Sequence, residues 1–239
     1  MPSAGRAIRR LVRTVTLGAG VLVAAAFPAG AGDTQLTLVP EINAYLKLND
    51  TMRLFFLGDV TANATTGSTD GEVGAHLDIT LAPILRYELR DANWERNRYL
   101  WIRVGYRLLA SLDDPVAVTE NRGVLEVTGR APLPWHLWLV NRLRLDLRDL
   151  EGDFSTRFRY RLGIEREFKL AETTLVPYAQ AEVFYDTRFG AWNRQRYQAG
   201  VEIELTEHVR IEPYYYRQED QRSSPAHLDQ VGVVLKLFF

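Results

Sequence analysis

Residues 141–148 read NRLRLDLR and residues 157–164 read RFRYRLGI, and these two stretches decide the fold. In both of them, charged or polar residues alternate with apolar ones. Successive side chains of a β-strand point to opposite faces, so this alternation predicts strands with one apolar face and one face rich in arginine. We therefore expect a sheet whose two faces meet chemically different surroundings.

The same alternation runs through nearly the whole chain after residue 34, and no stretch of helical periodicity competes with it. It predicts eleven strand segments, at about residues 35–48, 52–62, 75–90, 100–110, 117–131, 137–147, 157–165, 174–186, 194–205, 209–218 and 227–239. Bacterial single-chain membrane barrels have even numbers of strands. We therefore expect ten or twelve strands, with the segment 35–48 either split at Pro40 or lying outside the wall.

Two architectures use strands of this kind, and the strand length separates them. A β-sandwich buries its apolar faces between two sheets, whereas a membrane barrel turns them toward lipid and its polar faces toward the lumen. Most of these segments span 11–16 residues, which exceeds the usual five or six of soluble sheets and suits a tilted bilayer crossing. The fold class expected is all-β: an antiparallel transmembrane β-barrel of 10–12 strands, of the outer-membrane type.

Composition excludes several other classes. The chain has 239 residues, of which 46% are hydrophobic, with 29 basic and 30 acidic residues and no cysteine. A mean hydropathy of −0.18 argues against a bundle of membrane helices. The absence of cysteine excludes a disulfide scaffold, a thiolate metal site and a cysteine nucleophile. The balanced charge predicts no nucleic-acid partner, because such partners demand a basic face.

Residues 1–31 have the pattern of a cleaved secretory signal peptide. Four arginines precede an apolar stretch at 15–27, Pro28 interrupts it, and the small residues 29–31 match a cleavage site. Removing this segment leaves 25 basic and 30 acidic residues. We expect a product exported to the outer membrane of a Gram-negative cell, with residues 32–239 forming one barrel domain.

The chain ends on an apolar strand face with a terminal phenylalanine, Phe239. This resembles the last strand of Gram-negative outer-membrane proteins, so we expect Phe239 to be the signal read by the barrel-assembly machinery. With a periplasmic C-terminus, the longer connections should face outward. Trp94, Trp135, Trp138 and Trp192 lie in or beside the connections, as an aromatic girdle at the lipid interface requires.

Directing the arginine face inward gives a list of lumen residues. The predicted basic residues are Arg86, Arg103, Arg107, Arg122, Arg142, Arg144, Arg157, Arg159, Arg161, Arg194 and Arg196, and the predicted acidic ones are Glu88, Glu126, Asp146, Glu165, Glu167, Glu182, Glu202 and Glu204. Five arginines on two neighbouring strands, at 142, 144, 157, 159 and 161, exceed the acids expected near them, Asp146 and Glu165. This cluster is the best ligand candidate.

The sequence leaves three functions open. The lumen can be a narrow pore or binding site for an anionic small solute or an acidic glycan, or a solid core of salt bridges that plugs a structural barrel. An outer-membrane enzyme acting on lipid or glycan is the third, built on His227 and Asp229 near Ser223 and Ser224. Spacing alone shows no catalytic constellation and no metal-ligand pattern. We expect no enzyme, no metal and no cofactor, with membrane lipid as the main partner.

Several short motifs add a family resemblance. They are Gly105-Tyr106-Arg107, the run from Arg157 to Leu162, Pro177-Tyr178 with Glu182 and Phe184, and Arg196 with Gly200. The chain resembles the bacterial family called domain of unknown function 2490 over most of its length after the signal segment. The resemblance implies an outer-membrane barrel without an established activity. It draws attention to Arg107, Arg159, Arg161, Glu182 and Arg196.

Overall fold

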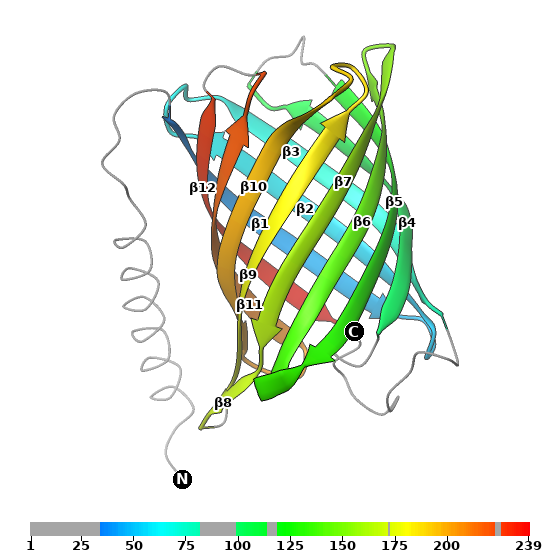
Figure 1. Ribbon diagram of the computed structural model, residues 1–239, viewed down its shortest axis with the longest axis vertical. Coiled ribbons are helices and arrows are strands. Elements are labelled where there is room, and N and C mark those ends of the chain that lie inside the picture. The colour runs from blue at the N-terminus through cyan, green and yellow to red at the C-terminus, as the bar shows by residue number, and fades with distance from the viewer. Residues whose placement is uncertain (1–33, 82–98, 114–118, 172, 223–225) are drawn as a thin grey trace. The chain divides into compact units, whose positions relative to one another are not determined.

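The computed structural model describes residues 34–81, 99–113, 119–171, 173–222 and 226–239, which form a closed β-barrel (Figure 1). Its strands are β1 (Thr34–Lys47), β2 (Met52–Asn63), β3 (Thr69–Thr80), β4 (Leu100–Ser111), β5 (Thr119–Leu133), β6 (Leu137–Leu150), β7 (Asp153–Arg166), β8 (Phe168–Leu170), β9 (Thr173–Asp186), β10 (Ala191–Glu204), β11 (Val209–Asp220) and β12 (His227–Phe238). In the described residues the one helical element is the 3-10 turn Pro134–His136, and no helix there is long and apolar enough to cross a membrane.

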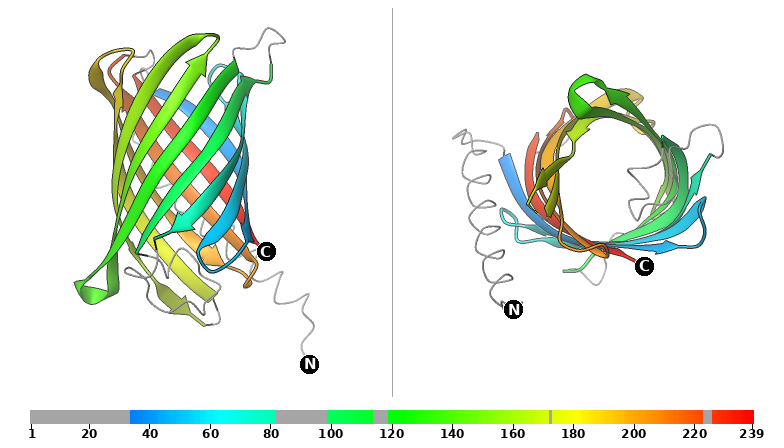
Figure 2. Two further views of the ribbon diagram at one scale, coloured as in Figure 1. Left: turned by 90° about the vertical axis from the view of Figure 1, so that its right-hand side faces the viewer. Right: turned by 90° about the horizontal axis from the view of Figure 1, so that it is seen from below.

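Eleven of these strands make the wall of the barrel. Each pairs with its neighbours along the chain, and β7 skips the three-residue β8 to pair with β9. The ring closes between β1 and β12, which run parallel and pair from Thr34–His227 to Tyr45–Phe238. Figure 2 shows the closed ring along its axis. The barrel prediction is confirmed.

The strand number and the closing pair differ from expectation. Among the described residues the wall has eleven strands, between the even values expected, and one pairing is parallel. The two findings have one cause. Strands joined by hairpins alternate in direction, so the first and last of an odd number point the same way and can only pair in parallel. The segment around Pro40 is an unbroken wall strand.

The strands carry their charges inward and their apolar side chains outward. On β6, Arg144, Asp146 and Arg148 are buried, whereas Leu143 and Leu147 between them are exposed. The described residues as a whole follow this rule: most buried side chains are polar or charged, and many large apolar side chains are exposed. Such an inverted distribution suits a barrel that has lipid outside and a polar lumen inside.

Connection lengths do not follow the predicted alternation. At the end away from the C-terminus, β6 and β7 are joined by the two-residue turn Glu151-Gly152, where both residues have positive φ. The longest connection, between β3 and β4, lies at the same end as the C-terminus. The third expected strand also differs, because β3 already begins at Thr69 and the predicted segment 82–90 lies outside the described residues.

Aromatic residues mark both rims. Trp135 is 79% exposed beside the start of β6 and Trp192 is 59% exposed at the start of β10, at the opposite rim. At the seam, the backbone N–H of Phe239 donates to the carbonyl of Tyr45 at 2.9 Å, and Lys47 donates to the Phe239 carbonyl at 2.9 Å. The predicted girdle residue Trp94 and the predicted signal segment 1–31 lie outside the described residues.

Candidate functional site

The central feature of the lumen is a row of charged side chains that crosses four adjacent strands. Arg142 on β6 is the register partner of Arg161 on β7, Arg161 of Glu182 on β9, and Glu182 of Arg196 on β10. Register partners point to the same face of a sheet. The period-two alternation therefore aims all four into the lumen at one level.

A second row lies two residues along each strand. It joins Glu126 on β5, Arg144 on β6, Arg159 on β7, Phe184 on β9 and Arg194 on β10. Phe184 is 1% exposed. The guanidinium groups of Arg159 and Arg194 lie 4.6 and 5.8 Å from the centroid of its ring. An aromatic face attracts a cation at such distances. The apolar ring thus stabilises the crowded arginines.

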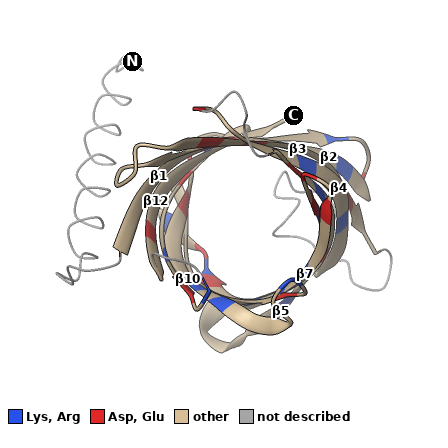
Figure 3. Ribbon diagram, turned by 90° about the horizontal axis from the view of Figure 1, so that it is seen from above, with Lys and Arg blue, Asp and Glu red and all other residues tan. Residues whose placement is uncertain are grey.

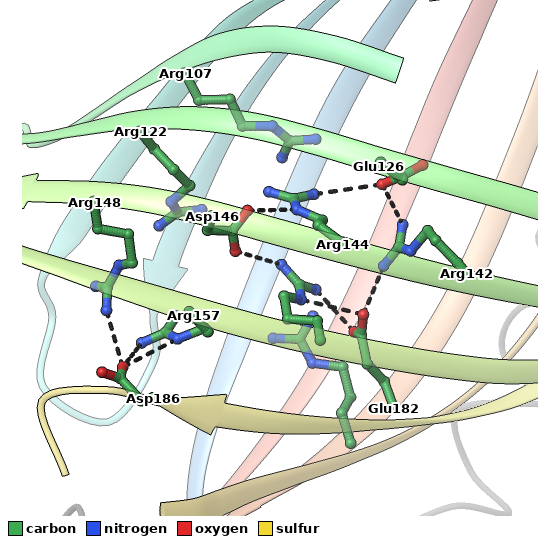
Figure 4. A network of polar contacts seen from close by, with 12 residues as sticks. Arg107, Arg122, Glu126, Arg142, Arg144, Asp146, Arg148, Arg157, Glu182 and Asp186 are labelled. Carbon is green, nitrogen blue, oxygen red and sulfur yellow. Dashed lines mark hydrogen bonds and ion pairs between the residues drawn. The ribbon is translucent and has the colours of Figure 1, made fainter. Parts of the chain in front are cut away.

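Carboxylates tie the two rows together (Figure 4). Glu182 accepts from Nη2 of Arg142 at 2.7 Å and from Nε and Nη2 of Arg159 at 3.1 and 2.8 Å. Asp146 accepts from Nε of Arg144 at 2.6 Å and has Arg159 Nη1 at 3.5 Å. These are charge-assisted bonds between planar forks, the strongest kind of side-chain hydrogen bond.

Glu126 completes this cluster from β5. Its Oε2 lies 3.4 Å from Nη1 of Arg142 and 4.0 Å from Nη1 of Arg144. Of the five arginines singled out from the sequence, four lie in this cluster together with three carboxylates. The fifth, Arg157, pairs with Asp186. We call the set Arg142, Arg144, Arg159, Arg161, Glu126, Asp146 and Glu182 the arginine cluster.

A second network lies nearer the rim that carries the β6–β7 turn. Asp186, at 0% exposure, is bonded by Arg148 at 3.2 Å, Arg157 at 2.9 Å and Arg188 at 3.3 Å. Glu120 on β5 accepts two bonds of 2.6 Å from Arg148. These pairs join β5, β6, β7 and β9. They brace the wall on this side of the barrel.

The other side of the lumen combines an ion triad with stacked rings. Asp78 on β3, at 0% exposure, is held by Arg53 on β2 at 2.8 Å and by Arg103 on β4 at 2.6 and 2.9 Å. The Arg103 guanidinium lies 4.0 Å from the centroid of Phe55, which stacks on Tyr45 at 4.8 Å. Ion pairs and stacked rings thus join β1, β2, β3 and β4 on this side of the lumen.

Beside the triad, β1, β2 and β3 present a row of carboxylates. Glu41 is the register partner of Asp59, and Asp59 is the partner of Glu72. Glu72 forms an ion pair with Arg107 at 2.6 Å, while Glu41 accepts from the amide of Asn43 at 2.6 Å. Figure 3 colours acidic and basic positions along the strands. The lumen is acidic along β1–β3 and basic along β6–β10.

These walls enclose a cavity of about 540 Å³. Of the described residues that line it, thirteen are basic and eight are acidic. Several of these arginines are also paired with buried carboxylates that do not line the cavity, such as Asp78, Asp146 and Asp186. The cavity lining itself therefore carries more basic than acidic side chains.

The predicted lumen residues can now be placed. All nine principal candidates line this cavity: Arg103, Arg107, Arg142, Arg144, Arg157, Arg159, Arg161, Glu182 and Arg196. Of the wider prediction, Arg122, Arg194, Glu126, Glu165 and Glu202 also line it. Whether any of them binds a ligand stays a prediction.

Other placements differ from expectation. Glu167 is exposed between β7 and β8, and Glu204 at the end of β10 is not among the cavity-lining residues. Glu165 forms an ion pair with Arg130, so the acids of the arginine cluster are Asp146, Glu126 and Glu182. The sequence could not show that Arg130 takes Glu165 and Arg142 takes Glu182, because these partners lie 35 and 40 residues apart. Arg86 and Glu88 lie outside the described residues.

Sequence reasoning missed the lumen residues of β1 and β2. The inward face of β2 carries Phe55 and Leu57 between Arg53 and Asp59, so the alternation of charged and apolar residues is weak along this strand. Parity counted from Arg53 would have found Asp59. When aromatic rings also face the lumen, every second residue counted from a known inward residue predicts the inward face better than the charge of each residue does.

The residues of the catalytic alternative are only partly described. Asp229 accepts from the hydroxyl of Tyr215 at 2.7 Å and lies 3.9 Å from Arg217. His76 is buried in the lumen, where Nε of Arg107 donates to its Nε2 at 3.1 Å. Ser223 and Ser224 lie outside the described residues. Within the described part of the chain, no cluster of three or more His, Asp or Glu side chains suits a metal ion.

Comparisons with known proteins match a family of unknown function and several solved structures. The sequence profile of the family described as "Protein of unknown function (DUF2490)" matches residues 81–229. The beta domain of the Bordetella autotransporter Brka is similar at 14% identity and a TM-score of 0.46, over 77% of this chain and 78% of that one. The siderophore receptor PirA of Pseudomonas aeruginosa is similar at 11% identity and a TM-score of 0.27, over 75% of this chain and 33% of that one. No curated protein matches the sequence.

Proposed function

The chain belongs to the DUF2490 family, and we propose that it is an outer-membrane β-barrel whose narrow lumen takes up anions. The observation that carries the proposal is the excess of basic over acidic side chains around the cavity. Small barrels with charged linings select solutes by sign, because the low-dielectric wall concentrates the field in the bore. The solute class is a small anion or an acidic glycan segment.

Export, assembly and location form part of the same proposal. The signal segment 1–31 would direct the chain across the inner membrane, and Phe239 would be read by the barrel-assembly machinery. The apolar outer face of the strands supports lipid as the surrounding solvent. Heat-modifiable gel migration in detergent and recovery in the outer-membrane fraction test this part. A mature chain that stays soluble and monomeric without detergent would overturn it.

One structural alternative has its own observation in favour. The ion pairs of the arginine cluster join β5, β6, β7 and β9, as a salt-bridged plug would. A plugged barrel would serve as a scaffold and would conduct nothing. The cavity of about 540 Å³ beside the network favours the conducting or binding lumen.

Planar bilayers separate the two functions. We expect small channel events from the purified barrel, and a reversal potential in a KCl gradient that shows chloride to be the more permeant ion. The proposal fails if no events occur and if substitutions at Arg159 and Arg161 change nothing but stability. A cation preference would also contradict it.

An enzymatic role is the weaker alternative, because Asp229 is engaged by Tyr215 rather than by a histidine. We propose that the barrel has no catalytic activity toward lipid. Lipid A and phospholipid profiles after overexpression test this proposal. A new lipid species that disappears in a His227→Ala variant would favour the enzyme instead.

A further inference from the structure

The arginine cluster contains more guanidinium groups than its carboxylates can pair. Glu182 lies between Arg161 and Arg196 in register, yet its two oxygens are bonded by Arg142 and Arg159 instead. Both partners of the Glu182 carboxylate therefore lie on β6 and β7, and none lies on β10. Neither of the two arginines that flank it in register forms an ion pair within 4.0 Å, although the charges of Glu182 and Glu126 act on Arg161 at longer range.

Arg161 is the clearer of the two. Its side chain is half-buried and lines the cavity, and it makes no hydrogen bond or ion pair with any described residue. A guanidinium group carries five donors and keeps its charge in proteins. In a narrow, weakly screened space such a group attracts an anion.

Arg196 is fixed in place but not neutralised. Its guanidinium lies 4.1 Å from the ring centroid of Tyr216, and Nη2 donates to Oε1 of Gln218 at 2.8 Å. Neither partner carries a negative charge, and no carboxylate pairs with Arg196 in the described part of the chain. The stacking holds the fork in one orientation, which reduces the entropy lost when a ligand binds.

Polar side chains are fixed next to the two arginines. On β9 and β10, Gln180 donates to Gln198 at 2.8 Å, and Gln198 donates to the hydroxyl of Tyr178 at 2.9 Å. Gln180 and Gln198 are register partners two residues along from Glu182 and Arg196. All three side chains line the cavity. They give the site a neutral, hydrogen-bonding edge.

Two carboxyl groups lie on the opposite wall. Glu41 and Asp59 also line the cavity, and neither forms an ion pair with a described Arg or Lys. They lie on β1 and β2, and β2 is across the ring from β7, with four wall strands between them on one side and five on the other. The two arginines without an ion pair therefore lie on the other side of the ring, on β7 and β10.

We propose that Arg161 and Arg196 form an oxyanion-binding subsite in the lumen, which takes the phosphate, sulfate or carboxylate group of a small solute. The proposal rests on the anion-preferring lumen proposed above and names its site. Guanidinium forks match the oxygen spacing of such groups and bind them bidentately. Chloride, which has no paired oxygens, should bind there more weakly.

Inorganic phosphate is the probe, and isothermal titration of the detergent-purified barrel is the measurement. We expect saturable binding that sulfate competes. Arg161→Gln and Arg196→Gln should each weaken phosphate binding about tenfold, since a hydrogen bond to a charged group is lost in each. Arg161→Lys keeps the charge but not the fork and should restore only part of the affinity.

Arg194→Gln is the matched control. Arg194 lies on β10 like Arg196 and lines the same cavity, and its replacement removes the same charge. In contrast to Arg196, it is bonded by Asp220 at 2.5 and 2.7 Å. The affinity of the Arg194→Gln variant for phosphate should stay close to that of the unmodified protein. Heat-modifiable migration confirms that each variant is folded before it is titrated.

The outcomes separate this proposal from the proposed function. Absence of saturable binding, or equal weakening by Arg194→Gln, overturns the subsite even if the barrel conducts anions. Binding that depends on Arg161 and Arg196 supports the subsite, and bilayer recordings then decide independently whether the lumen conducts.

Discussion

Replacing Glu182 by glutamine tests whether the arginine cluster is held together by its carboxylates. Glu182 is 3% exposed and accepts three hydrogen bonds from two arginines, at 2.7, 2.8 and 3.1 Å. The amide keeps the shape but loses the charge. Removing one partner from a buried ion pair costs about 3–5 kcal/mol, because the remaining charge stays buried without compensation.

The structure sets the expected cost near the lower end of that range. Arg142 still has Glu126 at 3.4 Å, and Arg159 still has Asp146 at 3.5 Å. We therefore expect Glu182→Gln to lower the free energy of unfolding by about 3 kcal/mol. Urea unfolding in lipid vesicles, followed by tryptophan fluorescence, measures it. The same variant should become more anion-selective in bilayers, because the lumen loses one negative charge.

Two further variants control this experiment. Glu207→Gln removes a carboxylate that is 76% exposed in the β10–β11 turn and should change stability little. The double variant Arg159→Gln with Glu182→Gln removes both charges, so it should recover part of the loss. If Glu182→Gln is no less stable than the unmodified barrel, or if anion selectivity falls, our account of the cluster is wrong.

Three other predictions follow from the packing. Asp78→Asn leaves two buried arginines without their shared carboxylate and should cost about 3–5 kcal/mol in urea unfolding. Gly232→Ala places a Cβ 2.2 Å from a ring atom of Tyr214 and should reduce the yield of heat-modifiable barrel. Gly58→Ala is the control, because its Cβ would meet no atom within 4 Å, and equal yields of the two variants would contradict the packing. Leu143→Arg, at the middle of the lipid face, should cost about 2–4 kcal/mol of unfolding free energy in vesicles, and Phe154→Arg at the rim about 0–1 kcal/mol; equal costs would argue against a bilayer around the strands.

Much of the site could be read from the sequence, because alternate residues of a strand point to the same face of the sheet. Arg157, Arg159 and Arg161 share a face at any register, and the structure turns all three into the lumen. What parity could not give is the partner of each charge. Arg161 and Glu182 are register partners, but the bonds of Glu182 go to arginines one strand further or two residues away.

The alternation of apolar and charged residues along long strands determined by itself that this chain forms a barrel with apolar walls and a charged lumen. That pattern is local, since each residue needs only its neighbours to be assigned a face. The parallel closure of β1 on β12, the ion pair between Arg142 and Glu182 forty residues apart, and the unpaired fork of Arg161 came from the tertiary structure alone. Register and curvature of the closed sheet decide which side chains meet across strands, and neither quantity is encoded in a single segment.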